Sequence, residues 1–289
     1  FVNCAGSPNG VIDGGLAIFA SGNEYAAMSS FPAAYSKCIS VSALAADYTP
    51  ASYSNYGSEV WLSAPGGDLE YYGTPGQSDN QYDENGILCE QGAIFSTLVL
   101  NGVAGYGYYE GTSMACPHVA GVAALGLSYA KQQKRHFTAG EFRELMFESA
   151  RDIEEYFTGE KLYYMRHESA GATPLKMNLE DYRGKMGRLT DAGALLRAID
   201  GSGRDMRIPN IWLAPQTSTT LCVDDYIWEQ AKSVEVVNSN IATATLSGNT
   251  LTVTGIAIGQ TSLTLTTAQG TKHHAPITVR EGDNDKGWL

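Results

Sequence analysis

Hydrophobic residues follow a different pattern in each part of the chain, and each pattern predicts a different structure. Between residues 16 and 66, short apolar runs alternate with turns rich in Gly, Ser and Pro, which predicts buried strands. The longer segments Ser113–Lys134 and Thr138–Ala150 predict helices. The second helix starts with a capping box from Thr138 to Glu141, in which each residue satisfies a backbone donor of the other.

The pattern changes twice in the second half of the chain. Residues 151–186 are polar and aromatic without a strong period, which predicts irregular structure with a strand. Residues 201–207 read GSGRDMR and predict a linker. After this point, 242–253 and 260–267 alternate Thr with Val, Leu and Ala between Gly turns, which is typical of a β-sandwich.

Composition narrows the class of protein. With 289 residues, 43% of them hydrophobic, the chain can bury the core of one large domain and one small domain. No apolar run approaches the length of a membrane span. The net charge of −12 argues against nucleic acid or an anionic membrane surface as partner and is compatible with a secreted enzyme.

The segment GTSMACPHVAG, Gly111–Gly121, carries the strongest chemical signal. It places Ser113 at a Gly-Thr turn directly before a helix of small residues, and Pro117 is expected in the first helical turn. A serine hydroxyl is a weak nucleophile that needs a base and donors for the oxyanion. The start of a helix supplies free N–H groups and a partial positive charge.

This segment closely resembles the active-serine motif of the subtilisin-like serine proteases (subtilases), which implies that Ser113 is the nucleophile and that its N–H is one oxyanion donor. The run LAIFASGNE, Leu16–Glu24, is similar to the strand and Gly-Asn turn of the same family. That similarity makes the amide of Asn23 the second donor, a role that suits a group that donates without ionising. The resemblance further implies that Gly22, Glu24, Gly111 and Thr112 bind substrate, with Glu24 near the primary specificity pocket.

Other segments extend the resemblance over about residues 1–200. Tyr35–Leu44 is similar to a strand of the family, and Ala51–Gly67 is similar to its Ser-rich loop and the strand that follows. Phe95–Thr97 is similar to the short strand before the nucleophile, and Gly187–Ala198 to the closing helix. The implied fold class is α/β, a subtilisin-like parallel sheet flanked by helices that is incomplete in this chain.

The catalytic acid and base are missing from the pattern. Subtilases present Asp, His, Asn and Ser in that order, yet no histidine precedes Asn23, and Asp13 is interpreted as a loop residue. His118 is expected to be structural and His136 to lie on a helix-to-helix connection. The remaining histidines are His167 in a polar stretch and His273 and His274 in the last strand region. We therefore expect the chain to come from a nicked precursor whose separate N-terminal chain supplies the Asp and His.

The cysteines and the acidic loop leave alternatives open. Of the five cysteines, Cys38 and Cys116 are expected to be buried, whereas Cys4 and Cys89 are candidates for a disulfide with each other or with the missing segment. Residues 68–91 are rich in Asp and Glu and are a candidate calcium loop. They lack a fixed ligand spacing, so a solvated acidic loop is favoured. No other cofactor or metal is predicted.

The C-terminal strands resemble bacterial immunoglobulin-like domains of the Big family, on the run VVNSNIATATLSGNTLTVTGIAIGQTSLTLT. The expected organisation is residues 1–206 as the C-terminal portion of a catalytic domain, 207–281 as an immunoglobulin-like all-β sandwich, and 282–289 as a tail. Such sandwiches usually act as spacers or adhesive modules.

Three functions fit these residues. The favoured one is a secreted or cell-surface endopeptidase that acts on protein or peptide substrates through an acyl-enzyme on Ser113. The alternative is a catalytically inactive fragment that serves as an adhesive or spacer module. A subtilase of transferase or cyclising type would carry the same nucleophile segment.

Overall fold

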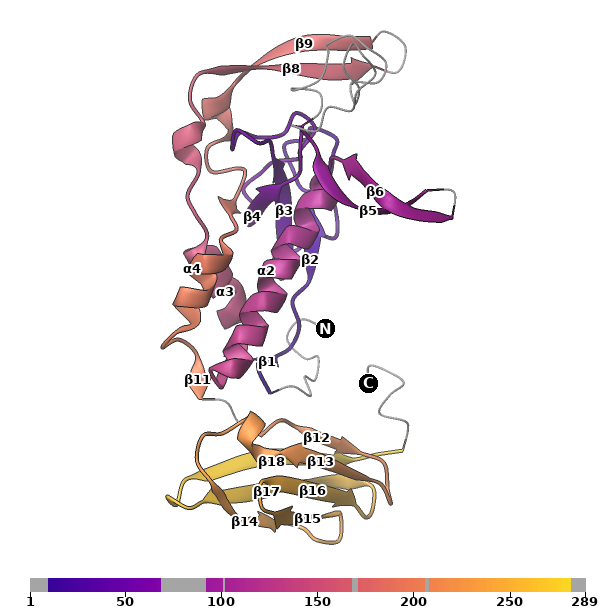
Figure 1. Cartoon of the computed structure of the whole chain (residues 1–289), viewed down its shortest axis with the longest axis vertical. Coiled ribbons are helices and arrows are strands. Elements are labelled where there is room, and N and C mark those ends of the chain that lie inside the picture. The colour runs from indigo at the N-terminus through magenta and orange to yellow at the C-terminus, as the bar shows by residue number, and fades with distance from the viewer. Residues whose placement is uncertain (1–9, 69–91, 101, 168–170, 206–207, 282–289) are drawn as a thin grey trace. The chain divides into compact units, whose positions relative to one another are not determined.

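The computed structural model describes residues 10–68, 92–100, 102–167, 171–205 and 208–281 (Figure 1). The chain divides into two compact units. Unit 2 comprises Leu16–Leu125 and Leu145–Leu195, and unit 1 comprises the chain up to Gly15, Gly126–Glu144 and the residues from Leu196 onwards. Ser113 and Asn23 both belong to unit 2.

The centre of unit 2 is a parallel sheet with the strand order β10-β4-β3-β2 (Figure 1). Strand β3 (Ile39–Leu44) is buried along its whole length, as expected for a parallel strand covered on both faces. Its neighbours are β2 (Ile18–Ala20) and β4 (Leu62–Pro65), and β10 (Arg188–Leu189) extends the sheet beyond β4. The strands predicted between residues 16 and 66 are thereby confirmed, and β2 forms one edge of this sheet.

Three α-helices are present in the described part of the chain. Helix α2 (Thr112–Gln132) begins one residue before Ser113, so Pro117 is its sixth residue and not part of the first turn. The helix therefore lacks the bond that residue 117 would donate to the Ser113 carbonyl. Helix α3 (Ala139–Ser149) has the predicted capping box, with Thr138 N–H donating to Glu141 Oε2 and Glu141 N–H donating to Thr138 Oγ1. Helix α4 (Ala192–Ile199) covers the second half of the predicted closing segment Gly187–Ala198 and ends one residue beyond it.

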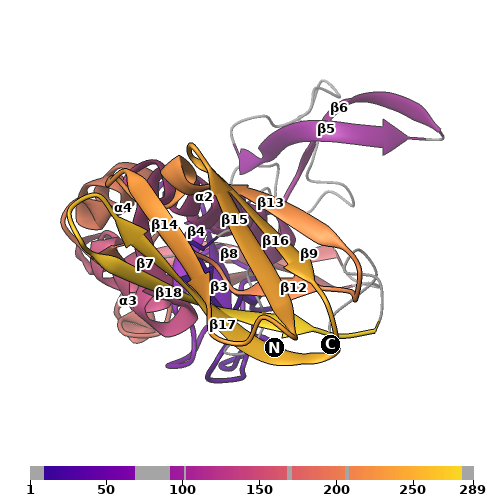
Figure 2. The ribbon, with the colours of Figure 1, turned by 90° about the horizontal axis from the view of Figure 1, so that it is seen from below.

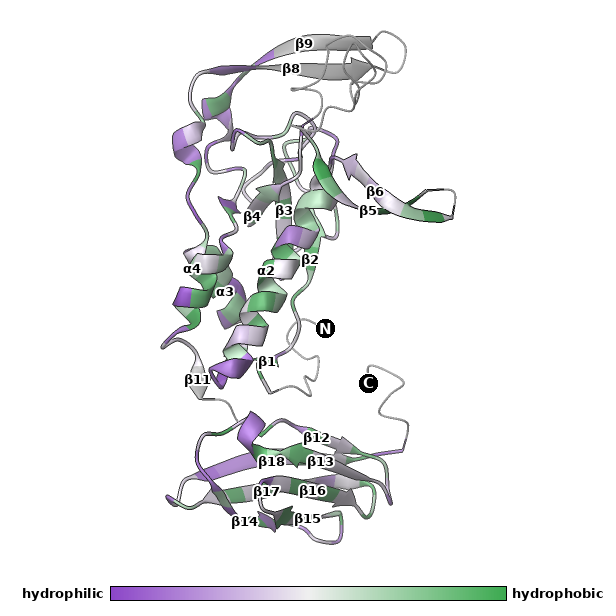
Figure 3. Ribbon diagram, in the orientation of Figure 1, coloured by the Kyte–Doolittle hydropathy of each residue, from purple (hydrophilic) through white to green (hydrophobic). Residues whose placement is uncertain are grey.

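Two antiparallel hairpins depart from the sequence prediction. Phe95–Thr97 lies inside the longer strand β5 (Ile94–Leu100), which pairs with β6 (Val103–Tyr109). Much of this hairpin is exposed, and hydrophobic residues lie along β5 (Figure 3). Residues 151–186 contain β8 (Glu160–His167), β9 (Gly171–Asn178) and the short helices η2 (Glu154–Tyr156) and η3 (Leu179–Tyr182). Each hairpin strand pairs only with its partner. The run IFSTLVL of β5 is apolar, but Phe95 and Val99 on it are exposed, so this run does not mark a core strand.

Unit 1 contains a small mixed sheet that the sequence did not predict. Strand β7 (Arg135–Thr138) lies between β1 (Ile12–Asp13), which is parallel to it, and β11 (Arg204–Asp205), which is antiparallel. His136 is thus on a strand and not on a simple connection between helices. Asp13 ends a strand, and part of the expected 201–207 linker is also a strand. These strands of two to four residues are too short to give a recognisable period.

Residues 208–281 of unit 1 are strand-rich, and their strands form two sheets (Figure 2). One sheet has the order β12-β18-β17-β14 and the other β13-β16-β15. Alternate residues are buried, such as Leu263 and Leu265 on one sheet and Leu251 and Val253 on the other, which confirms the predicted alternating strands. The elements are β12 (Ile211–Leu213), β13 (Ser218–Cys222), η4 (Val223–Asp225), β14 (Ala231–Val236), β15 (Ala242–Ser247), β16 (Thr250–Gly255), β17 (Gly259–Thr267) and β18 (Lys272–Val279).

Candidate active site

The turn before α2 exposes the candidate nucleophile. Gly111 is buried and has a φ of +143°, a conformation that side chains other than glycine rarely adopt. Its carbonyl accepts a hydrogen bond from Met114 N at 2.9 Å and so closes the first turn of the helix. Thr112 is fully buried, whereas Ser113 is exposed. The chain therefore folds back sharply at Gly111 and presents the Ser113 hydroxyl at the helix start.

Asn23 lies on the turn after β2 and binds the residue before Ser113. Its side-chain oxygen Oδ1 accepts hydrogen bonds from Thr112 N at 2.9 Å and from Thr112 Oγ1 at 2.8 Å. Because a backbone N–H can only donate, the side-chain atom that faces Thr112 N must be the oxygen. The amide nitrogen Nδ2 therefore points away from Thr112 and keeps its donors for another acceptor.

The two candidate donors border the same space. A Cβ atom placed on Gly111 would lie 3.6 Å from Asn23 Nδ2 and 3.6 Å from Ser113 N. Both nitrogens are thus within reach of one small volume beside the exposed serine. A developing oxyanion requires N–H donors beside it, and two nitrogens that border one volume are placed to supply them.

Gly22 and Glu24, two of the predicted substrate-binding residues, are held by Asn55. Asn55 Oδ1 accepts from the backbone N–H of Glu24 at 3.0 Å, and Asn55 Nδ2 donates to Glu24 Oε2 at 2.7 Å. Gly22 has a φ of +114°, and a Cβ there would lie 2.3 Å from Asn55 Nδ2, so only glycine fits. The Glu24 carboxylate also accepts from Ser30 Oγ at 3.4 Å and is therefore engaged within the loop.

Sequence reasoning missed Asn55 as the residue that shapes this loop. Its side chain is buried, and it also accepts from the backbone N–H of Ala26 at 2.9 Å. The only sequence signal was its place in the Ser-rich run ASYSNYG.

No base contacts the candidate nucleophile Ser113 among the residues that the structure describes. His118, on α2, has its Nδ1 2.8 Å from the Met114 carbonyl oxygen, a contact within the helix. His136 is buried in unit 1, where its Nε2 lies 3.0 Å from Asp13 Oδ2 and its Nδ1 lies 2.6 Å from the Gly10 carbonyl oxygen. The pairing of Asp13 with His136 was not foreseen, because 123 residues separate them.

The other three histidines lie on strands that are distant in sequence from the Gly111 turn. His167 ends β8, while His273 and His274 lie on β18 in unit 1. His274 Nδ1 is 3.0 Å from Thr264 Oγ1 on the neighbouring strand. In the described residues, no hydrogen bond joins any histidine or carboxylate to the Ser113 hydroxyl.

The predictions on disulfide and calcium fall largely outside the described residues. The structure does not describe Cys4, Cys89 or residues 69–91, so the disulfide and the calcium loop stay predictions. Cys38 is buried as expected, and Cys116 is half-buried, with its Sγ 3.6 Å from the Ile18 carbonyl oxygen. In the part of the chain that is described, no group of three His, Cys, Asp or Glu could hold a metal ion. None of the helices described is long and apolar enough to cross a membrane.

A model of the Subtilase family matches residues 9–182, which is more than half of the chain and includes both Asn23 and Ser113. The chain belongs to the subtilase family. A second family model, described as the Pilus formation protein N terminal region, matches residues 227–280 of this subtilase chain. The predicted resemblance of the C-terminal strands to Big-type immunoglobulin-like domains is not shown by this match and stays a prediction.

Extracellular proteases are among the relatives of this subtilase. Halolysin of Haloferax mediterranei is 40% identical over 113 residues, which is 39% of this chain and 17% of halolysin. The extracellular basic protease of Dichelobacter nodosus is 33% identical over 134 residues, 46% of this chain and 19% of that protein. The chain thus spans less than a fifth of the length of either relative. A solved protease structure from Pseudoalteromonas arctica is 25% identical, with 64% of this chain and 42% of the other covered and a TM-score of 0.41.

Proposed function

We propose that this chain supplies the nucleophile and the oxyanion hole of a secreted serine endopeptidase. The observation that carries the proposal is the shared space beside Gly111. A Cβ atom placed on Gly111 would lie 3.6 Å from Asn23 Nδ2 and 3.6 Å from Ser113 N. The membership in the subtilase family and the extracellular relatives support the same activity and the same location.

In this mechanism the Ser113 hydroxyl attacks the scissile carbonyl carbon of a peptide bond. Negative charge then develops on the carbonyl oxygen, which accepts hydrogen bonds from Ser113 N and Asn23 Nδ2. The positive end of the α2 dipole favours the same charge. Departure of the amine leaves an acyl-enzyme on Ser113, which water hydrolyses. Gly22 and Glu24 border the bound peptide. Gly111 and Thr112 are buried and act from behind it, since Thr112 donates two hydrogen bonds to Asn23 Oδ1.

The proton of Ser113 requires a base from another segment. We propose that an N-terminal chain of the same precursor carries the Asp and the His and associates with this chain after nicking. Two features support this: no described histidine contacts Ser113, and among the described strands β2 pairs only with β3 and so forms an edge of its parallel sheet. We refer to the assembly of both chains as the two-segment protein.

The C-terminal strands suggest the rival function. In that proposal residues 207–281 form an immunoglobulin-like sandwich, separate from a catalytic portion 1–206 and a tail 282–289, and serve as an adhesive or spacer module on an inactive fragment. The matched Pilus formation protein N terminal region over 227–280 is the observation in its favour. Intact mass measurement separates the two functions, because only the protease requires a co-purifying chain with an Asp and a His.

The direct test of the protease is labelling of the two-segment protein with a serine-directed phosphonate. We expect wild type and Ser128→Ala to be labelled and to cleave peptides, since Ser128 is an exposed serine on the same helix. Ser113→Ala should lose both properties while it keeps the same melting temperature. Peptide cleavage by Ser113→Ala at the wild-type rate would exclude Ser113 as the nucleophile.

A further inference from the structure

The hydroxyl of Tyr53 lies at the turn that precedes the nucleophile. Gly111 N–H donates a hydrogen bond to Tyr53 Oη at 2.8 Å. The Tyr53 hydroxyl in turn lies 2.8 Å from the Gly66 carbonyl oxygen and 2.7 Å from the Gly67 carbonyl oxygen, and it donates to this pair. One hydroxyl group therefore joins the turn after β4 to the residue two positions before Ser113.

The two turns are packed so closely that side chains are excluded between them. A Cβ on Gly66 would lie 2.9 Å from the Gly111 carbonyl oxygen and 3.1 Å from Tyr53 Oη. Gly111 N also donates to the Gly66 carbonyl at 2.9 Å. The hydroxyl of Tyr53 thus fills a position that no larger or apolar group could occupy with the same contacts.

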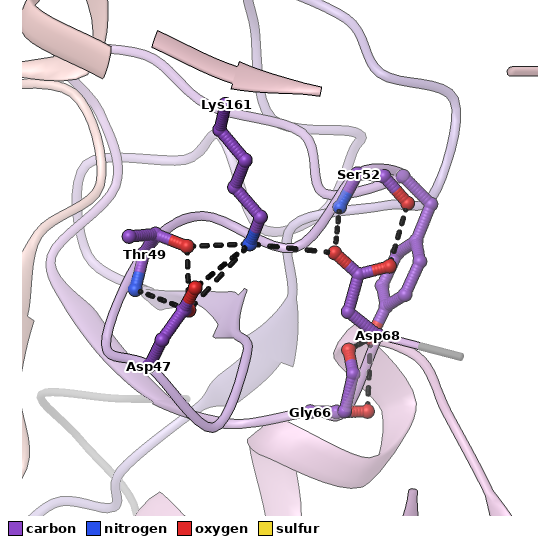
Figure 4. A network of polar contacts seen from close by, with 8 residues as sticks. Asp47, Thr49, Ser52, Gly66, Asp68 and Lys161 are labelled. Atoms are coloured by element: carbon purple, nitrogen blue, oxygen red, sulfur yellow. Dashed lines mark hydrogen bonds and ion pairs between the residues drawn. The ribbon is translucent and has the colours of Figure 1, made fainter. Parts of the chain in front are cut away.

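The segment that carries Tyr53 is itself held by buried charges (Figure 4). Asp68, which is fully buried, accepts from Ser52 N at 3.0 Å and from Ser52 Oγ at 2.8 Å. The ammonium group of Lys161 lies 3.8 Å from Asp68 Oδ2 and is also buried. The backbone next to Tyr53 is therefore fixed independently of the Tyr53 hydroxyl.

Tyr53 stays protonated over the working range of a protease. Burial raises the pKa of its hydroxyl, and the negative charges of Glu110 and Asp68 raise it further. The group therefore remains a donor to the Gly66 and Gly67 carbonyls and an acceptor for Gly111 N.

We propose that Tyr53 is a positioning residue of this active site, which sets the orientation of the Gly111 peptide and through it the direction of the Ser113 N–H. The proposal rests on the proposed function and adds a residue to it. Asn23 holds Thr112, and Tyr53 holds Gly111, so two successive residues before the nucleophile are each fixed by a side chain from another segment. Ser113 N then has one direction relative to Asn23 Nδ2.

The kinetic test compares Tyr53→Phe with Tyr56→Phe in the two-segment protein. Both variants lose only a hydroxyl, and Tyr56 packs through its ring against Tyr25 and Tyr182. We expect Tyr53→Phe to lower kcat by about 10- to 100-fold, because small displacements of catalytic groups cost this much, with KM within about twofold. Tyr56→Phe should keep both constants. Equal kcat in all three proteins, or a loss of kcat that only follows the folded fraction, would overturn the proposal.

Hydrogen exchange gives a second readout that does not depend on activity. We expect the amides between Tyr109 and Met114 to exchange faster in Tyr53→Phe than in wild type and Tyr56→Phe, while the amides of β3 keep their protection. Unchanged exchange at Gly111 and its neighbours would overturn the positioning role. A wild-type protein that cleaves no peptide but shows the faster exchange in Tyr53→Phe would reject the proposed function and retain Tyr53 as the anchor of this turn.

Discussion

At the scale of single residues, Asn23 uses the two ends of its amide for different purposes. The oxygen receives two hydrogen bonds from Thr112, and the nitrogen borders the space beside Gly111. An aspartate would keep the first function and lose the second, because a carboxylate accepts the same bonds but donates none. This division allows the structural role of Asn23 and its proposed catalytic role to be separated.

We therefore predict that Asn23→Asp and Asn23→Ala both lower kcat of the two-segment protein by about 10²–10³, a magnitude taken from removal of an oxyanion-hole donor in subtilisin, a member of the same family. KM should change little. Asn23→Asp should keep the wild-type melting temperature, whereas Asn23→Ala should lower it, because the donors on Thr112 lose their acceptor. Full activity in Asn23→Asp would exclude the amide nitrogen from catalysis.

Tyr53 leads to a prediction about alkaline stability. Its pKa is raised in the folded state above the ordinary value of 10.0, so above pH 10 the unfolded chain releases this proton and the folded chain does not. The stabilisation by Tyr53 is therefore complete below pH 10 and is lost as the pH rises further, by up to about 1.4 kcal/mol per pH unit. The difference in unfolding free energy between wild type and Tyr53→Phe, measured in urea from pH 9 to 11, should shrink accordingly. A constant difference would contradict this prediction.

At the scale of elements, the β8–β9 hairpin is anchored by one of its two lysines and not by the other. Lys161 on β8 is buried between Asp68 and Asp47, with its Nζ 3.4 Å from Asp47 Oδ2 (Figure 4). Burial lowers the pKa of Lys161, while the two carboxylates act in the opposite direction. Lys176 on β9 forms an exposed ion pair with Glu160. We expect the buried ion pairs of Lys161 to contribute more to the free energy of unfolding than the exposed ion pair of Lys176.

We predict that Lys161→Met destabilises the two-segment protein by about 3–5 kcal/mol, because it leaves the buried Asp68 carboxylate without its cation. The matched variant Lys176→Met on the same hairpin should cost less than about 1 kcal/mol, as exposed pairs do. Free energies of unfolding from urea titrations measure both effects. Equal losses would show that Asp68 does not depend on Lys161.

At the scale of the whole molecule, unit 2 exposes a strand edge and part of an apolar helix face. Strand β2 is a sheet edge, and helix α2 exposes Pro117, Ala120, Ala124 and, to 49%, Leu125. The exposed apolar surface and the strand edge both favour association with another chain. The same surfaces lie on the unit that carries Ser113.

This leads to a prediction for the isolated chain. Expressed alone, it should be poorly soluble and should not react with a serine-directed phosphonate, because no histidine or carboxylate among the described residues is bonded to Ser113. Co-folding with the proposed N-terminal segment should restore both solubility and labelling at Ser113. Labelling is measured by intact mass spectrometry and solubility by size-exclusion chromatography. Robust labelling of a monodisperse single chain would refute the two-segment proposal.

The sequence by itself determined the features that depend on local patterns. The run at Gly111–Gly121, the Gly-Asn turn at Asn23 and the buried strands between residues 16 and 66 could all be predicted, because they are continuous in the chain. The capping box at Thr138 belongs to the same group. The alternation after residue 208 also predicted strands correctly, since burial on one face leaves a period of two.

Only the tertiary structure decided which distant groups bind one another. No local period in the sequence indicates these contacts. They pair Asn55 with Glu24, Tyr53 with Gly111, Lys161 with Asp68 and His136 with Asp13. The hairpins were predicted only in part. A strand was expected at Phe95–Thr97 and another within 151–186, but the pairing of β5 with β6 and of β8 with β9 depends on a second strand, which the pattern of one strand does not indicate. A polar side chain finds its partner by proximity in the folded chain, so its role is fixed only once the backbone has brought the two segments together.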